Sequence, residues 1–169
     1  MTEAGRKINM DDLKADSLVM LQLRSDPWWN SAWAFLVPAL VARAAWGESL
    51  LLGIFVPGFL RYVWLLHCTW CVNSVAHLWG ERPYDPAINP AEHWGVTLLA
   101  IGEGWHNWHH KYPFDYAASE LGVSSQFNPT KLAIDLAAAL GMVSDRKRAT
   151  AMWAREKAKR GAEAKAKEQ

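Results

Sequence analysis

The sequence lacks a pronounced net charge of either sign. Its 169 residues carry 18 Lys and Arg against 17 Asp and Glu, a formal net charge of +1. Nucleic-acid-binding domains concentrate positive charge against phosphates, so the chain as a whole makes no electrostatic case for a nucleic-acid partner. The N-terminus also lacks the pattern of a signal peptide, because MTEAGRKINMDDLKADS is polar and no apolar core follows at once.

Cysteine is scarce, since Cys68 and Cys71 form a single C-x-x-C pair. A thioredoxin-like redox pair needs a strand-to-helix setting, whereas these two residues lie in the apolar run WLLHCTWCV. We therefore expect buried thiols without a redox role. A zinc site built from His67 and the two cysteines is disfavoured, because adjacent residues do not share a helix face.

Tryptophan and long apolar runs are abundant by contrast, with 11 Trp and 51% hydrophobic residues. Two segments, residues 31–46 (SAWAFLVPALVARAAW) and 49–71 (SLLLGIFVPGFLRYVWLLHCTWC), carry one charge each. As a helix, the second segment is about 35 Å long, enough to cross a hydrocarbon core of roughly 30 Å. The first is shorter and contains Pro38, which membrane helices tolerate. Both segments are therefore predicted to be transmembrane helices.

A pair of buried helices in a soluble protein is the alternative to a membrane hairpin. Neither segment has a polar stripe of helical period, and Trp28, Trp29, Trp33 and Trp46 lie near the segment ends, as in an aromatic belt. These features favour a membrane hairpin with a two-residue link. Because 16 of the 18 Lys and Arg lie outside the two segments, the positive-inside rule predicts that both tails are cytosolic.

Composition divides the chain into four parts. We expect a cytosolic lead-in segment at residues 1–30, a transmembrane helical hairpin at 31–72, a cytosolic histidine-rich cap at 73–144 and a basic tail at 145–169. Within the cap, residues 92–111 and the run that follows Pro129 are expected to be helical. The tail is expected to be disordered or a frayed helix, solvated, with attraction to anionic lipid as a secondary possibility.

Three of the six histidines lie in GEGWHNWHHKYPFDY, residues 102–116. Helical positions i, i+3 and i+4 lie within about 100° of arc, so His106, His109 and His110 are predicted to share one helix face. Neutral imidazole is a ligand for iron, zinc and copper, and the cluster therefore predicts a metal site. Glu103 precedes His106 by three residues, which matches a Glu-x-x-His metal motif; alternatively, it orients an imidazole by a hydrogen bond.

A second polar face precedes the cluster, because Asn73 and His77 stand at i and i+4 in NSVAH. They lie at the cytosolic end of the second predicted span. Spacing alone would leave His77 more often an ordinary polar residue than a ligand. His67 and His93 are expected to be polar or interfacial residues without a role at the metal.

The two histidine stretches together carry a family resemblance. NSVAHLWGERPYD followed by GEGWHNWHHKYPFDY resembles the last histidine motifs of the membrane fatty acyl-CoA desaturases of the stearoyl-CoA Δ9 type, and the similarity extends from Asp11 to about Thr150. The resemblance implies a fold of four membrane helices under a cytosolic cap with a di-iron centre of nine histidine ligands. The expected fold is therefore all-α and integral to the membrane, incomplete relative to that family fold.

The resemblance also implies roles for individual residues. His77, His106, His109 and His110 would be iron ligands, and Asn73 would hold an iron-bound water. Thr69 and Trp70 would line the tunnel for the acyl chain. The implied reaction is the oxygen-dependent insertion of a cis double bond into a fatty acyl-CoA, with electrons from cytochrome b5 or a similar donor, in the lipid of the endoplasmic reticulum membrane.

The sequence departs from the family in what precedes Asp11. The first two membrane helices and the first two histidine motifs, HxxxxH and HxxHH, have no counterpart in the chain, so at most four of the nine ligands remain. We therefore expect the C-terminal part of a desaturase, inactive as this chain alone. Two alternatives stay open: a related histidine-motif enzyme such as a hydroxylase, and a non-catalytic membrane partner that modulates a full-length desaturase.

Overall fold

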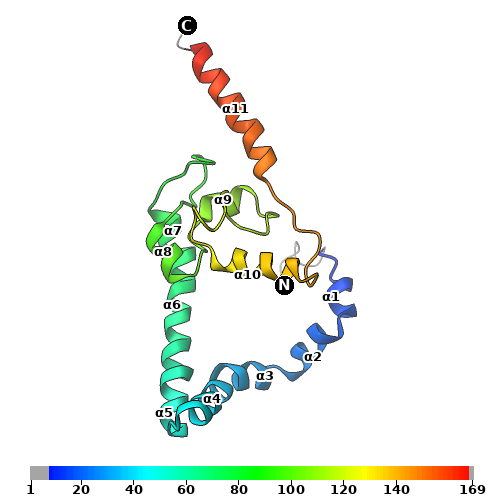
Figure 1. Cartoon of the computed structure of the whole chain (residues 1–169), viewed down its shortest axis with the longest axis vertical. Helices are drawn as coiled ribbons and strands as arrows, with labels where there is room; N and C mark the ends of the chain where they lie inside the picture. The colour runs from blue at the N-terminus through cyan, green and yellow to red at the C-terminus, as the bar shows by residue number, and fades with distance from the viewer. Residues whose placement is uncertain (1–7, 168–169) are drawn as a thin grey trace. The chain divides into compact units, whose positions relative to one another are not determined.

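The computed structural model describes residues 8–167, and the regular elements within that range are helices (Figure 1). Single antiparallel bridges join Glu81 to Glu92 and Glu92 to Trp105. The predicted all-α class is therefore confirmed for the described residues. The start of the expected lead-in, residues 1–7, and the last two residues of the basic tail lie outside them.

Two compact units make up the chain, Met1–Trp64 and Leu65–Gln169. The first unit contains seven described elements and the start of an eighth. They are α1 (Asp11–Ala15), α2 (Ser17–Ser25), α3 (Trp28–Ser31), the π-helix η2 (Ala32–Leu36), α4 (Val37–Trp46), α5 (Leu50–Gly53), the π-helix η3 (Ile54–Leu60) and the first residues of α6 (Arg61–Asn73). Helix α2 begins where the Asp16 carboxylate accepts hydrogen bonds from the Leu18 and Val19 amides.

A helical hairpin forms the larger part of the first unit. The backbone is helical from α3 through η2 to the end of α4, where Gly47 takes the left-handed conformation (φ 74°) that only glycine adopts without strain. The Ser49 hydroxyl then caps α5 by accepting from the Leu52 amide at 3.2 Å. The two arms pack through small residues, because a Cβ on Gly53 would lie 3.0 Å from the Cα of Ala39.

Arg61 links the two arms of the hairpin. Its guanidinium donates from Nε to the Pro57 carbonyl and from a terminal nitrogen to the Ala34 carbonyl, both at 2.6 Å. Pro38 follows Ala34 by four residues and has no N–H to donate to that carbonyl. The charged side chain of an otherwise apolar helix thus pairs with a backbone oxygen that proline leaves without its usual helical partner.

One helix among the described residues, Leu50–Leu78, is long and apolar enough to cross a membrane by length and composition. It contains the second predicted span and only 11% of its apolar window is buried, as expected for a surface that faces lipid. The first predicted segment, residues 31–46, does form the other arm of the hairpin. Its crossing of a membrane stays a prediction.

The second unit begins within α6 and continues with five further helices among the described residues. These are α7 (Val75–Leu78), α8 (Trp94–Leu99), α9 (His106–Lys111), α10 (Pro129–Ala139) and α11 (Thr150–Lys167). Cys68 and Cys71 both lie on α6 as free thiols, the first of them buried, so the strand-to-helix setting of a redox pair is missing. Helix α10 begins at Pro129, as predicted, with Asn128 as its cap.

The predicted helix over residues 92–111 is wrong as a single element, because the chain forms α8 and α9 with a turn between them. At this turn Ile101 and Gly102 have φ values of 55° and 105°, which no α-helix accommodates. Gly104 makes the return possible: a Cβ there would lie 2.3 Å from the Thr97 nitrogen and hydroxyl. The backbone of the turn therefore packs directly against α8.

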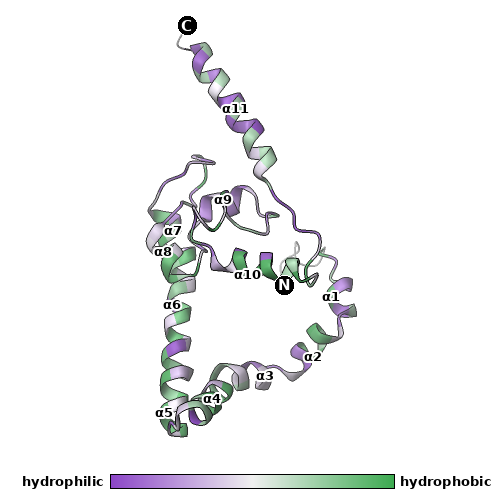
Figure 2. Ribbon diagram, in the orientation of Figure 1, coloured by the Kyte–Doolittle hydropathy of each residue, from purple (hydrophilic) through white to green (hydrophobic). Residues whose placement is uncertain are grey.

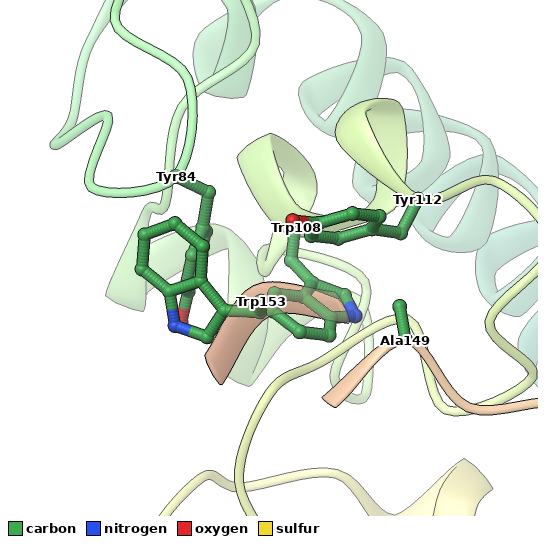
Figure 3. Packing of buried hydrophobic residues seen from close by; sticks show 5 residues of the cluster. All are labelled: Tyr84, Trp108, Tyr112, Ala149 and Trp153. Carbon is green, nitrogen blue, oxygen red and sulfur yellow. The ribbon is translucent and has the colours of Figure 1, made fainter. Parts of the chain in front are cut away.

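The basic tail is helical from Thr150 to Lys167 rather than disordered. Figure 3 shows its anchor, in which Trp153 and Ala149 pack with Tyr84, Trp108 and Tyr112 in one buried aromatic cluster. The ring centroid of Tyr84 lies 4.8 Å from that of Trp108 and 5.1 Å from that of Trp153. Beyond this anchor α11 is largely hydrophilic, whereas α6 and α10 are dominated by apolar residues (Figure 2).

Candidate metal centre

Three histidine side chains meet in the second unit, from two helices that are far apart in sequence. The Nε2 atom of His106 lies 2.9 Å from Nε2 of His77 on α7 and 3.0 Å from Nε2 of His110 on α9. All three can offer ligand nitrogens within 4.8 Å of one another. His106 is buried, His77 is half-buried and His110 is exposed, so the cluster is open on one side.

His109 shares the predicted helix face only in part. Its ring stacks beside that of His106 with centroids 5.8 Å apart and an interplanar angle of 26°. It does not belong to the set whose nitrogens converge. The structure thus brings together His77, His106 and His110, and leaves His109 on the flank of that cluster.

Burial and mutual proximity lower the pKa of two imidazoles of the cluster, His106 and His110. The pKa of His106 is lowered to about 4, mainly by burial and further by His110, His77 and His109. Burial, together with His77 and His109, also lowers the pKa of His110. A neutral imidazole has a free lone pair, which is the form that binds a metal ion.

The separations of the His106 nitrogen from its two neighbours fit a shared metal ion. One imidazole nitrogen carries either a proton or a single lone pair, so Nε2 of His106 cannot make two ordinary hydrogen bonds, one to each neighbour. A metal bonded to nitrogens at about 2.0–2.1 Å would hold adjacent ones about 2.8–3.4 Å apart, for bond angles between octahedral and tetrahedral. The observed separations of 2.9 and 3.0 Å lie within that range.

Three other predicted site residues line a cavity beside α6. Thr69, Asn73 and Glu103 belong to its wall, together with apolar side chains such as Leu65 and Leu99, and its volume is about 290 Å³. The amide nitrogen of Asn73 donates to the Thr69 carbonyl at 3.3 Å. Glu103 lies in the turn before α9, on the cavity wall, and is not one of the converging ligands.

Trp70 does not line that cavity. Its side chain is 56% exposed, and its ring meets that of His67 edge-on at 5.4 Å. The remaining histidine, His93, caps α8 by accepting from the Val96 amide through Nδ1 at 3.2 Å. Neither His67 nor His93 belongs to the set of side chains whose ligand nitrogens converge.

Asn107 is a buried residue of the site that sequence reasoning missed. Its side-chain oxygen accepts from the amides of Tyr84 and Asp85, and its nitrogen donates to the carbonyls of Asp85 and Pro90. These four bonds fasten the proline-containing loop before α8 to the helix that carries His106. The only sequence signal was a lone Asn inside HNWHH.

Lys111 fixes the other end of α9 to the C-terminal helix. Its ammonium group lies 2.6 Å from the Glu156 carboxylate and 2.8 Å from the Tyr84 carbonyl. Arg160 and Tyr112 also donate to Glu156. The pKa of Glu156 is accordingly lowered to about 2, first by the hydrogen bond from Lys111.

An apolar helix long enough to cross a membrane and a cluster of three imidazoles indicate a membrane-associated protein with a candidate metal centre. No family model matches the chain. Curated relatives do. The chain is 50% identical over 146 residues to an acyl-CoA desaturase of Cyprinus carpio, which covers 86% of the chain and 44% of that protein.

Two proteins named stearoyl-CoA desaturase 5 show a similar identity and coverage. The protein from Bos taurus is 50% identical and that from Homo sapiens 48% identical, each over 148 residues, which is 88% of this chain and 44% of the relative. The matched residues of the chain belong to the acyl-CoA desaturase family. It spans less than half the length of these relatives.

Proposed function

We propose that this chain supplies the C-terminal part of the iron site and of the acyl-chain tunnel in an acyl-CoA desaturase. The observation that carries the proposal is the convergence of His77, His106 and His110 in a chain that is 50% identical over 146 residues to such an enzyme. Iron, when bound, supplies the oxygen-dependent removal of two hydrogens from an unactivated acyl chain. In this proposal His109 is a fourth ligand, reached by a turn of its ring.

The other residues of the site have separate roles in this proposal. The three converging imidazoles hold the metal as neutral donors, and Asn73 holds a water against it by hydrogen bonding. The cavity beside Thr69 is mainly apolar, which suits an acyl chain and excludes water from it. Trp70, which is exposed on α6, would line the tunnel once further protein or lipid covers that helix.

The membrane setting is part of the same proposal. The arms of the hairpin at residues 31–72 both cross the bilayer, and both tails lie on the cytosolic side of the endoplasmic reticulum membrane. Arg61 supports a crossing of both arms, because its charge is paired with carbonyls from each of them, as intramembrane charges require. The partners are fatty acyl-CoA, molecular oxygen and cytochrome b5 or a similar electron donor.

The chain alone is proposed to be inactive. Its described cluster offers three converging imidazoles and one flanking imidazole, whereas the resemblance implies nine for the two irons. Four imidazoles can hold one metal ion but cannot enclose two.

A chimera tests this proposal. Residues 11–150 of this chain replace the matching segment of the Cyprinus carpio relative, and the chimera is expressed in a host that lacks desaturase. We expect unsaturated acyl chains from the chimera, none from its His106→Ala variant and none from the chain alone. An inactive but stably expressed chimera, or rescue of the host by the chain alone, contradicts the proposal.

A further inference from the structure

Residues Ala91–His93 form a junction between the two helices that carry the clustered histidines. The Ala91 amide donates to the Ala76 carbonyl, one residue before His77, at 2.7 Å. The His93 amide donates to the Gly104 carbonyl, two residues before His106, at 2.9 Å. Between them, Glu92 exchanges two backbone hydrogen bonds with Glu81. This short segment therefore spaces α7 from α9.

The side chain of Glu92 adds a contact with α9 itself. Its Oε1 atom accepts a hydrogen bond from the Trp108 amide at 2.9 Å. Trp108 lies in the first turn of α9, where amides have no partner within the helix, and Trp105 before it provides no side-chain cap. A carboxylate at a helix N-terminus is also favoured by the helix dipole. Glu92 thus caps the histidine helix from outside it.

The contact with α9 holds this carboxyl group through Oε1. Its second oxygen, Oε2, is buried and has no hydrogen-bond partner within the part of the chain that the structure describes. A buried polar atom without a partner is rare in proteins, so packing stability alone does not account for a glutamate here. The length of the side chain does account for a glutamate at this position, because it brings a hydrogen-bond acceptor from the junction to α9.

We propose that Glu92 is a positioning residue, which sets the distance between His77 and His106 by capping α9 from the segment that also binds α7. The proposal rests on the proposed metal-binding function of the cluster. It requires an acceptor at the position of Oε1 and does not require a negative charge. A side chain of equal length with a neutral acceptor should therefore suffice, and a shorter carboxylate should not.

Three substitutions of Glu92 separate the effect of side-chain length from the effect of charge. Glu92→Gln keeps the length and an acceptor, Glu92→Asp keeps the charge but withdraws the acceptor by about one carbon–carbon bond, and Glu92→Ala removes both. Glu81→Ala is the matched control, because Glu81 is the backbone partner of Glu92 and its side chain is exposed. Helix content by circular dichroism in detergent micelles shows that each variant is folded.

Two measurements on the full chain read out the positioning. Amide exchange of α9 without metal reports the cap, and titration with Co²⁺ alone, followed by its visible absorption, reports the cluster. In the Ala and Asp variants we expect the Trp108 amide to exchange at least about tenfold faster and Co²⁺ affinity to fall by about tenfold or more, as for other groups that orient ligands. The Gln variant and the Glu81 control should stay within about threefold of the parent chain on both.

The outcomes distinguish this inference from the proposed function. Unchanged exchange of α9 in folded Glu92→Ala overturns the inference whether or not cobalt binds. Full retention of both properties by Glu92→Asp with loss in Glu92→Gln also overturns it, since charge would then be the requirement. A parent chain that fails to bind Co²⁺ counts against the proposed function, while faster exchange in Glu92→Ala and not in Glu92→Gln still supports the positioning role.

Discussion

Asn107 allows the cost of losing one side chain of the site to be worked out bond by bond. Its side chain is fully buried and makes four hydrogen bonds of 2.9 to 3.1 Å to the loop at residues 84–90. Asn107→Ala removes all four at once and leaves their backbone partners without the amide. The loop would then be held to α9 mainly by the aromatic packing of Tyr84 and by the hydrogen bond from Lys111 to the Tyr84 carbonyl.

The magnitude follows from the burial of those partners. The bonds to the Tyr84 amide and the Pro90 carbonyl are buried, and a buried group left unpaired costs about 1–3 kcal/mol. The two bonds to Asp85 are part-buried, so water replaces them and they add less. The expected loss of local stability is therefore about 2–6 kcal/mol, which corresponds to faster amide exchange by at least about thirtyfold.

Hydrogen exchange by mass spectrometry measures this effect on the peptides that cover residues 84–112. Asn107→Asp makes the test sharper, because it keeps the acceptor but turns a second oxygen toward the carbonyls of Asp85 and Pro90; it should be at least as damaging as Ala. Asn89→Ala is the control from the same loop, since the Asn89 side chain is exposed. Acceleration of less than about threefold in folded Asn107→Ala would refute the reasoning.

Three further predictions concern the cluster, the turn before it and the C-terminal helix. His106→Ala should lower Co²⁺ affinity at least about tenfold by equilibrium dialysis, whereas His67→Ala should leave it unchanged. Gly104→Ala should unfold the turn or displace α8, because its Cβ would overlap backbone at 2.3 Å; loss of protection in residues 92–106 would show this. Glu156 has its pKa lowered to about 2 from an ordinary 4.5, so its contribution is present above about pH 4.5 and is lost as the pH falls toward 2. Trp153 fluorescence should report this loosening of α11 in the parent chain and a flatter profile in Glu156→Gln, and identical profiles would contradict it.

Local pattern in the sequence predicted the elements whose causes are local. The start of α10 follows from Pro129 at its first turn and the long apolar helix from a hydrophobic run with a single charge, and both are confirmed. The break between α8 and α9 was missed because the sequence TLLAIGEGW is compatible with a helix. It breaks at Ile101–Gly104, where the backbone packs against Thr97, and no periodicity reports such a contact.

The candidate site was likewise predicted where its causes are local and missed where they are not. Helical spacing predicted that His106 and His110 share a face, and the structure places these two side chains together on one helix. It could not predict the contact of His106 with His77, 29 residues away, because only tertiary structure sets that distance. The family resemblance did pair these residues, whereas the groups that hold them in place carry no metal-ligand signature: Asn107 and Glu92 read as ordinary polar residues.

The support of the histidines comes from three directions, and this bears on how the cluster can change. Asn107 fastens the loop to α9, Glu92 caps the start of that helix, and Lys111 fixes its end to Glu156. His77, in contrast, stands on a four-residue helix that continues the apolar span. Since α9 carries both His106 and His110 while His77 is attached to the span, a displacement of the span alters the distances from His77 to His106 and to His110, while His106 and His110 keep theirs. Coupling between membrane position and metal affinity is therefore expected through His77 alone.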